Sequence, residues 1–183
     1  MRKLAFVAAL VLMTTFAFGQ KKYFTRTGNI SFFSDATLED ITANNHQVTA
    51  LINTADGKLA YKVPIKGFEF EKALMQEHFN ENYMESDKYA EASFDGAIED
   101  LKKVDFTKSG TYKVTVKGKL TMHGVTKDVS MPGEVIVDAT NNKVTTKCTF
   151  KVALKDYNIK NDKVGKIADE IEIRVNVEMT EKK

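Results

Sequence analysis

The sequence predicts an all-β protein with one helix, built as an antiparallel β-barrel of about eight strands. Long segments alternate strictly between apolar and polar residues, and a period of two indicates a strand with one apolar face. A helical period is found over one segment only, residues 70–83. In residues 111–122 the apolar face consists of Tyr112, Val114, Val116, Leu120 and Met122, with Gly118 among them.

The N-terminal part is expected to begin with a hairpin. Its strands would cover residues 23–27 and 30–35 and turn at Gly28-Asn29, because glycine and asparagine tolerate the backbone of tight turns. Residues 37–44 have no clear alternation and are expected to form a short helical or irregular link.

A second hairpin is expected around residues 54–57, between strands at 47–53 and 58–66. Pro64 lacks a backbone N–H, which suggests a sheet edge or a bulge at that point. The apolar face of the later strand consists of Leu59, Tyr61, Val63 and Ile65.

The predicted helix covers residues 70–83. Its apolar residues lie toward one side and its charged residues in other directions, as in an amphipathic helix of moderate quality. The apolar residues are Phe70, Ala73, Leu74, Phe79 and Tyr83.

Strand patterns return after the helix and continue to the C-terminal region. A tight turn at His123-Gly124 separates two long strands, Asn141-Asn142 forms another turn, and residues 155–169 are expected to be mainly loop. The strands are expected at 90–98, 111–122, 125–138, 143–154 and 170–179.

The N-terminus predicts export. Arg2 and Lys3 precede an apolar run that ends in Ala-Phe-Gly, which is the pattern of a secretory signal peptide. We expect cleavage after Gly19, so residues 1–19 are the signal peptide and residues 20–183 form one domain in the periplasm or outside the cell. An uncleaved anchor is the alternative. No cysteine follows the cut, which argues against lipoprotein anchoring.

The mature chain would carry 25 basic and 25 acidic residues, since the signal peptide removes two of the 27 basic ones. This balance gives no electrostatic reason to expect nucleic acid as a partner. Cys148 is the single cysteine, so no internal disulfide is expected. Its position on an inward face predicts a buried, unreactive thiol.

Two alternatives concern the barrel interior. Inward alternation fits an open bore that holds one small ligand, and it fits equally a core packed solid with side chains. An outer-membrane barrel also alternates, but we expect no stable membrane insertion because paired aromatic girdles and a terminal aromatic residue are missing.

Catalytic and metal-binding patterns are not found. His46, His78 and His123 have no histidine or cysteine partner at metal-ligand spacing, and His123 is interpreted mainly as a turn residue. We therefore expect no catalytic residues, no metal and no cofactor. Aromatic residues gather around the helix, where they either pack it onto the barrel or form a hydrophobic lid: Phe32, Phe33, Phe68, Phe70, Phe79, Tyr83, Tyr89 and Phe94.

Three blocks of sequence resemble the YceI-like family. Residues 120–127, Leu-Thr-Met-His-Gly-Val-Thr-Lys, followed by Val129, resemble its central hairpin, and residues 84–94 resemble its Lys-Tyr-Pro stretch, with Ala90 in the proline's place. Residues 150–159 and 169–173 fit its closing pattern. The similarity covers roughly residues 22–180.

The resemblance implies an extended, lipocalin-like barrel that binds a polyisoprenoid, a quinone-type lipid or another long-chain amphiphile, often as a homodimer. It implies no catalytic residues. An enzyme that modifies an isoprenoid or quinone, and a structural or stress-related exported protein, are the alternatives. Our face assignments predict ligand contacts from Phe32, Phe68, Phe79, Tyr83, Phe94, Val114, Val116, Met131, Val135 and Phe150.

Overall fold

The computed structural model describes residues 21–35, 40–161 and 167–182. The predicted signal peptide lies outside these residues, so export stays a prediction. The strands are β1 (Lys22–Ser34), β2 (Ile41–Asn53), β3 (Lys58–Pro64), β4 (Phe68–Phe70), β5 (Glu91–Ile98), β6 (Gly110–Met122), β7 (Val125–Asp138), β8 (Lys143–Ala153) and β9 (Glu170–Glu181).

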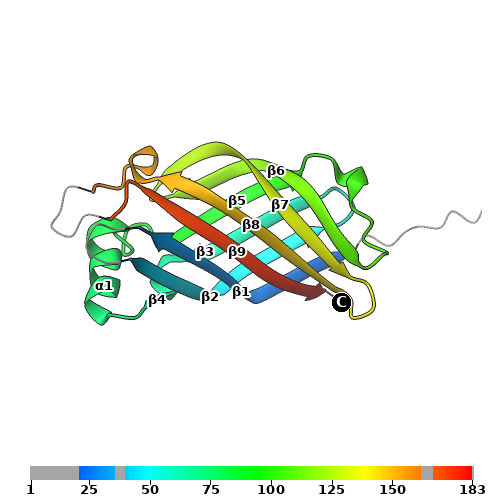
Figure 1. Cartoon of the computed structure of the whole chain (residues 1–183), viewed down its shortest axis with the longest axis horizontal. Helices are drawn as coiled ribbons and strands as arrows, with labels where there is room; N and C mark the ends of the chain where they lie inside the picture. The colour runs from blue at the N-terminus through cyan, green and yellow to red at the C-terminus, as the bar shows by residue number, and fades with distance from the viewer. Residues whose placement is uncertain (1–20, 36–39, 162–166, 183) are drawn as a thin grey trace, which may run out of the picture.

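Eight of these described strands close into an antiparallel barrel, which confirms the predicted fold class (Figure 1). The order around the barrel is β1-β9-β8-β7-β6-β5-β3-β2, and pairing of β2 with β1 closes it. The remaining strand, β4, pairs with β2 at Ala43–Asn45. Closure leaves no long unpaired edge, and the strands cross the barrel at a tilt.

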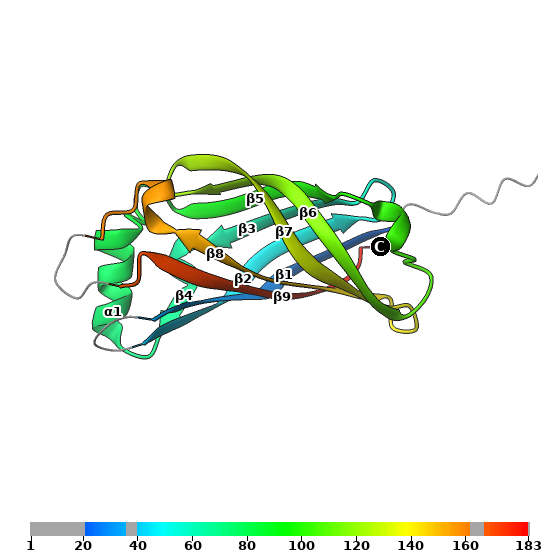
Figure 2. The same ribbon diagram turned by 45° about the horizontal axis from the view of Figure 1, so that its top comes forward.

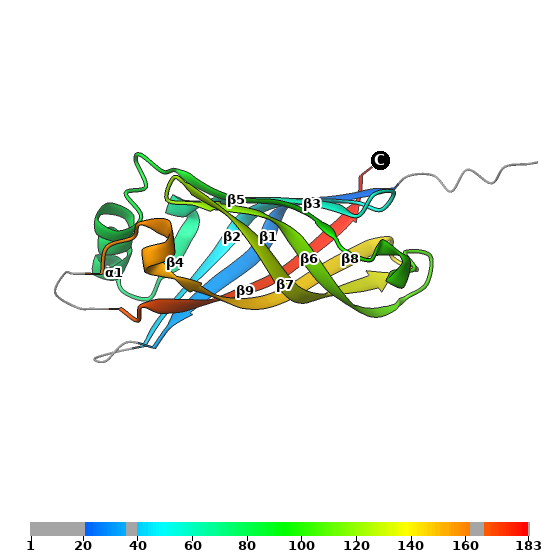
Figure 3. The same ribbon diagram turned by 90° about the horizontal axis from the view of Figure 1, so that it is seen from above.

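The two ends of the barrel differ. One end carries β4, the short helix α1 (Ala73–His78), its π-helical continuation η2 (Phe79–Tyr83) and the helical turn η4 (Leu154–Tyr157). We call this the helical end; it lies to the left in Figures 1 and 2. The opposite end, called the far end, holds the C-terminus and the connections β2–β3, β5–β6 and β7–β8 (Figure 3).

The predicted first hairpin is wrong, because residues 22–34 form the single strand β1. Gly28 marks a register shift within that strand instead of a turn. A Cβ atom at this position would lie 2.8 Å from Val177 and 3.2 Å from the Val48 carbonyl oxygen. Glycine is therefore needed for close packing in a bulged strand, which sequence alone does not distinguish from a turn.

The predicted link at 37–44 is wrong where it can be compared, since β2 already begins at Ile41. Residues 37–39 lie outside the described part of the chain. Asn45 hides the alternation because it is polar yet fully buried. Its amide nitrogen donates to the Pro64 carbonyl (2.7 Å), and its side-chain oxygen accepts from the backbone of Gln47 (2.9 Å). These bonds satisfy the buried amide.

The predicted helix is shorter than expected. Phe70 belongs to β4, where it pairs with Ala43, and the α-helical part begins at Ala73. The predicted β2–β3 hairpin and the His123-Gly124 turn are confirmed. Both turn residues have positive φ, 49° and 74°, which matches the twist of a two-residue hairpin.

Candidate functional site: an apolar cavity inside the barrel

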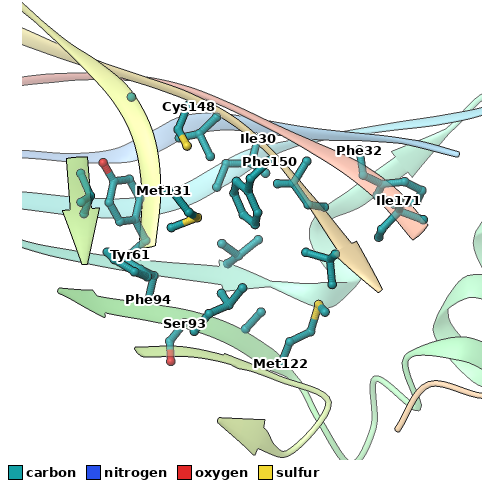
Figure 4. Close-up of a pocket in the computed structure, with 18 of the residues that line it drawn as sticks. Ile30, Phe32, Tyr61, Ser93, Phe94, Met122, Met131, Cys148, Phe150 and Ile171 are labelled. Carbon is teal, nitrogen blue, oxygen red and sulfur yellow. The ribbon is translucent and has the colours of Figure 1, made fainter. Parts of the chain in front are cut away.

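A cavity of about 160 Å³ lies inside the barrel (Figure 4). Its walls are formed by inward-facing residues of β1 and β3–β9, joined by side chains from η2, from η4 and from the loop after η4. Nearly all of these side chains are apolar. The strands place them there because every second residue faces inward, while the intervening residues carry charge outside, as in the Lys119–Asp128 and Lys143–Glu178 ion pairs.

All ten residues predicted to contact a ligand line this one cavity. They come from β1, β4, η2 and four strands of the opposite wall, so the fold brings together residues up to 118 positions apart in the sequence. Contact with a ligand remains a prediction. The ten residues are Phe32, Phe68, Phe79, Tyr83, Phe94, Val114, Val116, Met131, Val135 and Phe150.

Several lining residues are absent from that prediction. Tyr61 and Ile65 lie on the apolar face of an alternating segment, so the sequence pattern could have identified them as lining residues. Ile159 and Ile167 come from an irregular loop, where no periodicity identifies an inward side chain. Met84 follows η2 and also lacks a pattern.

The cavity fills only the helical half of the barrel. Toward the far end the bore is packed solid by eight side chains that are at most 2% exposed and do not line the cavity. The open bore and the packed core, which the sequence left as alternatives, are therefore both present: the helical half is hollow and the far half is filled. The residues of the packed half are Tyr23, Val48, Ala50, Ile52, Val137, Val144, Val177 and Met179.

A hydrogen bond crosses the bore at the inner end of the cavity. The Tyr61 hydroxyl on β3 donates to Thr146 Oγ1 on β8 over 2.7 Å, and Thr146 lies 3.4 Å from the Val177 carbonyl oxygen. Burial raises the pKa of Tyr61 to about 12, so the phenol stays a neutral donor at physiological pH. The Phe94 ring lies beside Tyr61, with 6.2 Å between centroids.

Four phenylalanine rings form a cluster at the helical end. Phe79 of η2 lies 5.5 Å from Phe32, 5.5 Å from Phe68 and 5.1 Å from Phe70, measured between ring centroids. These separations are typical of favourable aromatic pairs. The cluster packs the helix onto the barrel, and three of its rings, Phe32, Phe68 and Phe79, also line the cavity, so both sequence-based interpretations of the aromatic residues fit the geometry.

His123 is more than a turn residue. It is 8% exposed; its Nδ1 donates to the Tyr157 carbonyl oxygen over 3.0 Å, and its Nε2 lies 2.9 Å from a Glu85 carboxylate oxygen. The Tyr89 ring packs against it in a tilted arrangement, with 4.4 Å between centroids. The adjacent residues Met122 and Met84 line the cavity, so this contact joins three wall segments at the helical end.

We expect His123→Asn to lower the free energy of unfolding by about 1–3 kcal/mol, because it removes a buried hydrogen bond to Tyr157 and a partly buried one to Glu85. Asparagine tolerates the positive φ at this position, so the turn itself is preserved. Urea titration followed by circular dichroism measures the change. His46→Asn, at an exposed position, is the matched control, and equal effects of the two substitutions would contradict the role given to His123.

Cys148 faces the cavity, as its inward position predicts, and is partly buried. Its thiol donates to the Pro132 carbonyl oxygen over 3.2 Å. Burial raises the pKa of the Cys148 thiol to about 11. Because the thiolate is the reactive form, this shift supports the predicted unreactive thiol.

We expect iodoacetamide to alkylate Cys148 at neutral pH about a hundredfold more slowly in the native protein than in urea-unfolded protein. The raised pKa reduces the thiolate fraction, so the native rate should keep increasing with pH toward about 11. Mass spectrometry at timed intervals measures the rate. A native rate that levels off near the usual thiol pKa would contradict this expectation.

Within the described residues, no three histidine, cysteine, aspartate or glutamate side chains lie close enough to hold a metal ion. Among the helices of that same part, none has the length and apolar character needed to cross a membrane.

Solved structures share this architecture. A polyisoprenoid-binding domain from Saccharophagus degradans aligns with a TM-score of 0.75 at 13% identity, covering 90% of this chain and all of that one. BcnA of Burkholderia cenocepacia aligns with a TM-score of 0.68 at 17% identity over 84% of this chain and 96% of that one. A YceI protein of Campylobacter jejuni gives 0.64 at 20% identity, over 80% and 88%.

Sequence comparison points to the same group. A protein of the UPF0312 group from Photorhabdus laumondii is 27% identical over 131 residues, which are 69% of this chain and 64% of that protein. The family model of the YceI-like domain matches residues 15–179, nearly the whole chain. The chain therefore belongs to the YceI-like domain family.

Proposed function

We propose that the protein binds a long-chain isoprenoid or another amphiphilic lipid inside the barrel and acts as an exported carrier or sequestering protein. The apolar cavity is the observation that carries this proposal. A water-filled cavity needs polar partners for its waters, and these walls offer few, so an apolar guest is favoured. The similar domain from Saccharophagus degradans is described as polyisoprenoid-binding, which supports a lipid of this kind.

The tail of the lipid would lie along the inward faces of β6, β7 and β8, at Val116, Met131 and Phe150. Burial of its surface would stabilise the complex by about 25 cal/mol per Å², less the cost of ordering the tail. The polar head would lie at the helical end, because the opposite half of the bore is packed solid.

We assign a binding role in preference to catalysis. Two of the hydroxyl groups at the cavity wall, those of Tyr61 and Thr146, are hydrogen-bonded to each other and belong to the structure of the wall. A homodimer also remains a prediction, and light scattering of the purified protein tests it.

Extraction of protein purified from its native host, followed by mass spectrometry of the extract, tests the proposal. We expect one class of amphiphile at a constant ratio to protein, and its loss in the cavity-filling variant Val116→Trp. Repeated preparations without any amphiphile would overturn the binding role. Cell fractionation with N-terminal sequencing tests export, with the mature chain expected to begin at Gln20.

A further inference from the structure

Toward the far end, residues of five strands bound the cavity. Its lining residues nearest the far end are Leu59 on β3, Val114 on β6, Val135 on β7, Thr146 on β8 and Val175 on β9. The next inward residues on β7, β8 and β9 are all fully buried in the packed half. A ligand tail that enters from the helical end therefore meets a closed floor.

The hydrogen bond between Tyr61 and Thr146 forms the centre of this floor. Three strands separate β3 from β8 in either direction around the barrel, so the two residues come from opposite walls. Beside them on the neighbouring strands lie Ala50, which pairs with Tyr61, and Val177, which pairs with Thr146; both are 0% exposed. The phenol thus spans the bore from β3 to β8, and Leu59 lies beside it as the next inward residue of β3.

The depth above this floor is short. The cavity wall extends over eight residue steps both from Val114 to Met122 and from Thr146 to Leu154. At about 3.4 Å per residue and a strand tilt of about 40°, eight positions correspond to about 20 Å along the barrel axis. One leaflet of a bilayer has a hydrocarbon thickness of about 15 Å, so this depth suits a single tail of leaflet length.

We propose that the Tyr61–Thr146 pair sets the maximum tail length of the ligand, and that the cavity takes a single-tailed amphiphile whose tail is about as long as one bilayer leaflet. This inference rests on the proposed lipid-binding function. A much longer polyisoprenoid would have to leave the remainder of its tail outside the cavity.

A homologous series of straight-chain fatty acids, from octanoic to tetracosanoic acid, tests this rule. Each acid is titrated calorimetrically into the full mature protein after solvent extraction of bound lipid. We expect Kd to fall by up to about fourfold for each added methylene and then to stop falling once the tail reaches the floor. A parallel series of prenols, from geraniol to long polyprenols, should reach its plateau at a similar extended length.

Tyr61→Val removes the phenol while keeping a residue suited to a strand. We expect its plateau to move to a longer acid, with about tenfold tighter binding of the first acid beyond the wild-type limit. Val114→Met should move the plateau to a shorter acid, because Val114 pairs with Gly133, which leaves room for a longer side chain at the floor. Lys62→Ala, on the outer face of the same strand, should leave the plateau unchanged.

Each outcome decides a different point. If affinity for the wild-type protein rises through the longest acid, the length rule is wrong and lipid binding stands. If no fatty acid or prenol binds, the proposed function itself fails. A wild-type plateau that neither Tyr61→Val nor Val114→Met moves would overturn the assignment to this floor. Near-ultraviolet circular dichroism shows whether each variant is folded. If Tyr61→Val does not fold, Val114→Met still tests the floor independently.

Discussion

Val116→Trp is expected to weaken binding of a long-chain lipid by roughly a hundredfold while the barrel remains folded. Val116 lines the cavity one inward position above Val114, between the floor and the aromatic cluster. An indole there would displace about three methylene groups of the tail, each contributing about 0.8 kcal/mol. Calorimetric titration with a fatty acid that fits the wild-type cavity measures the loss.

Lys117→Trp is the matched control for this substitution. Lys117 is the next residue on β6, faces outward and forms an ion pair with Glu99. Surface ion pairs contribute little, so this variant should bind lipid as the wild type does. If both tryptophan variants bind equally well, the ligand does not occupy this cavity.

Ile52→Ala is expected to lower the free energy of unfolding by about 2–5 kcal/mol, the range for deletion of a fully buried aliphatic side chain. Ile52 is 0% exposed and lies in the packed half of the bore. The neighbouring side chains there cannot close the resulting void without moving the strands. Urea-induced unfolding measures the change, and lipid affinity should be almost unaffected.

Ile173→Ala makes the same chemical change in the other half of the bore. Ile173 lines the cavity and is partly exposed to it, so its methyl groups have fewer contacts to lose. We expect a smaller loss of stability, about 1 kcal/mol, together with weaker lipid binding. Equal stability losses at the two positions would contradict the division of the barrel into a packed half and a hollow half.

The site residues could be predicted because of the period of two. On β6 and β8 the alternation places Val114, Val116 and Phe150 inward, and the structure confirms these positions. The alternation did not identify inward residues where the strand is bulged, where a polar residue is buried, or where the chain is irregular. Gly28 lies in a bulge, Asn45 is buried through its hydrogen bonds, and Ile159 enters the cavity from an irregular loop.

The sequence by itself determined that strands with one apolar face must close around a common interior, because alternation dictates which residues leave water. It also identified the His123-Gly124 turn from local chemistry. Only the tertiary structure decided that the interior is hollow in one half and filled in the other. Whether the interior is hollow or filled depends on how side chains from opposite walls pack across the bore, as Tyr61 does with Thr146. The alternation within one strand does not determine the distance between opposite walls.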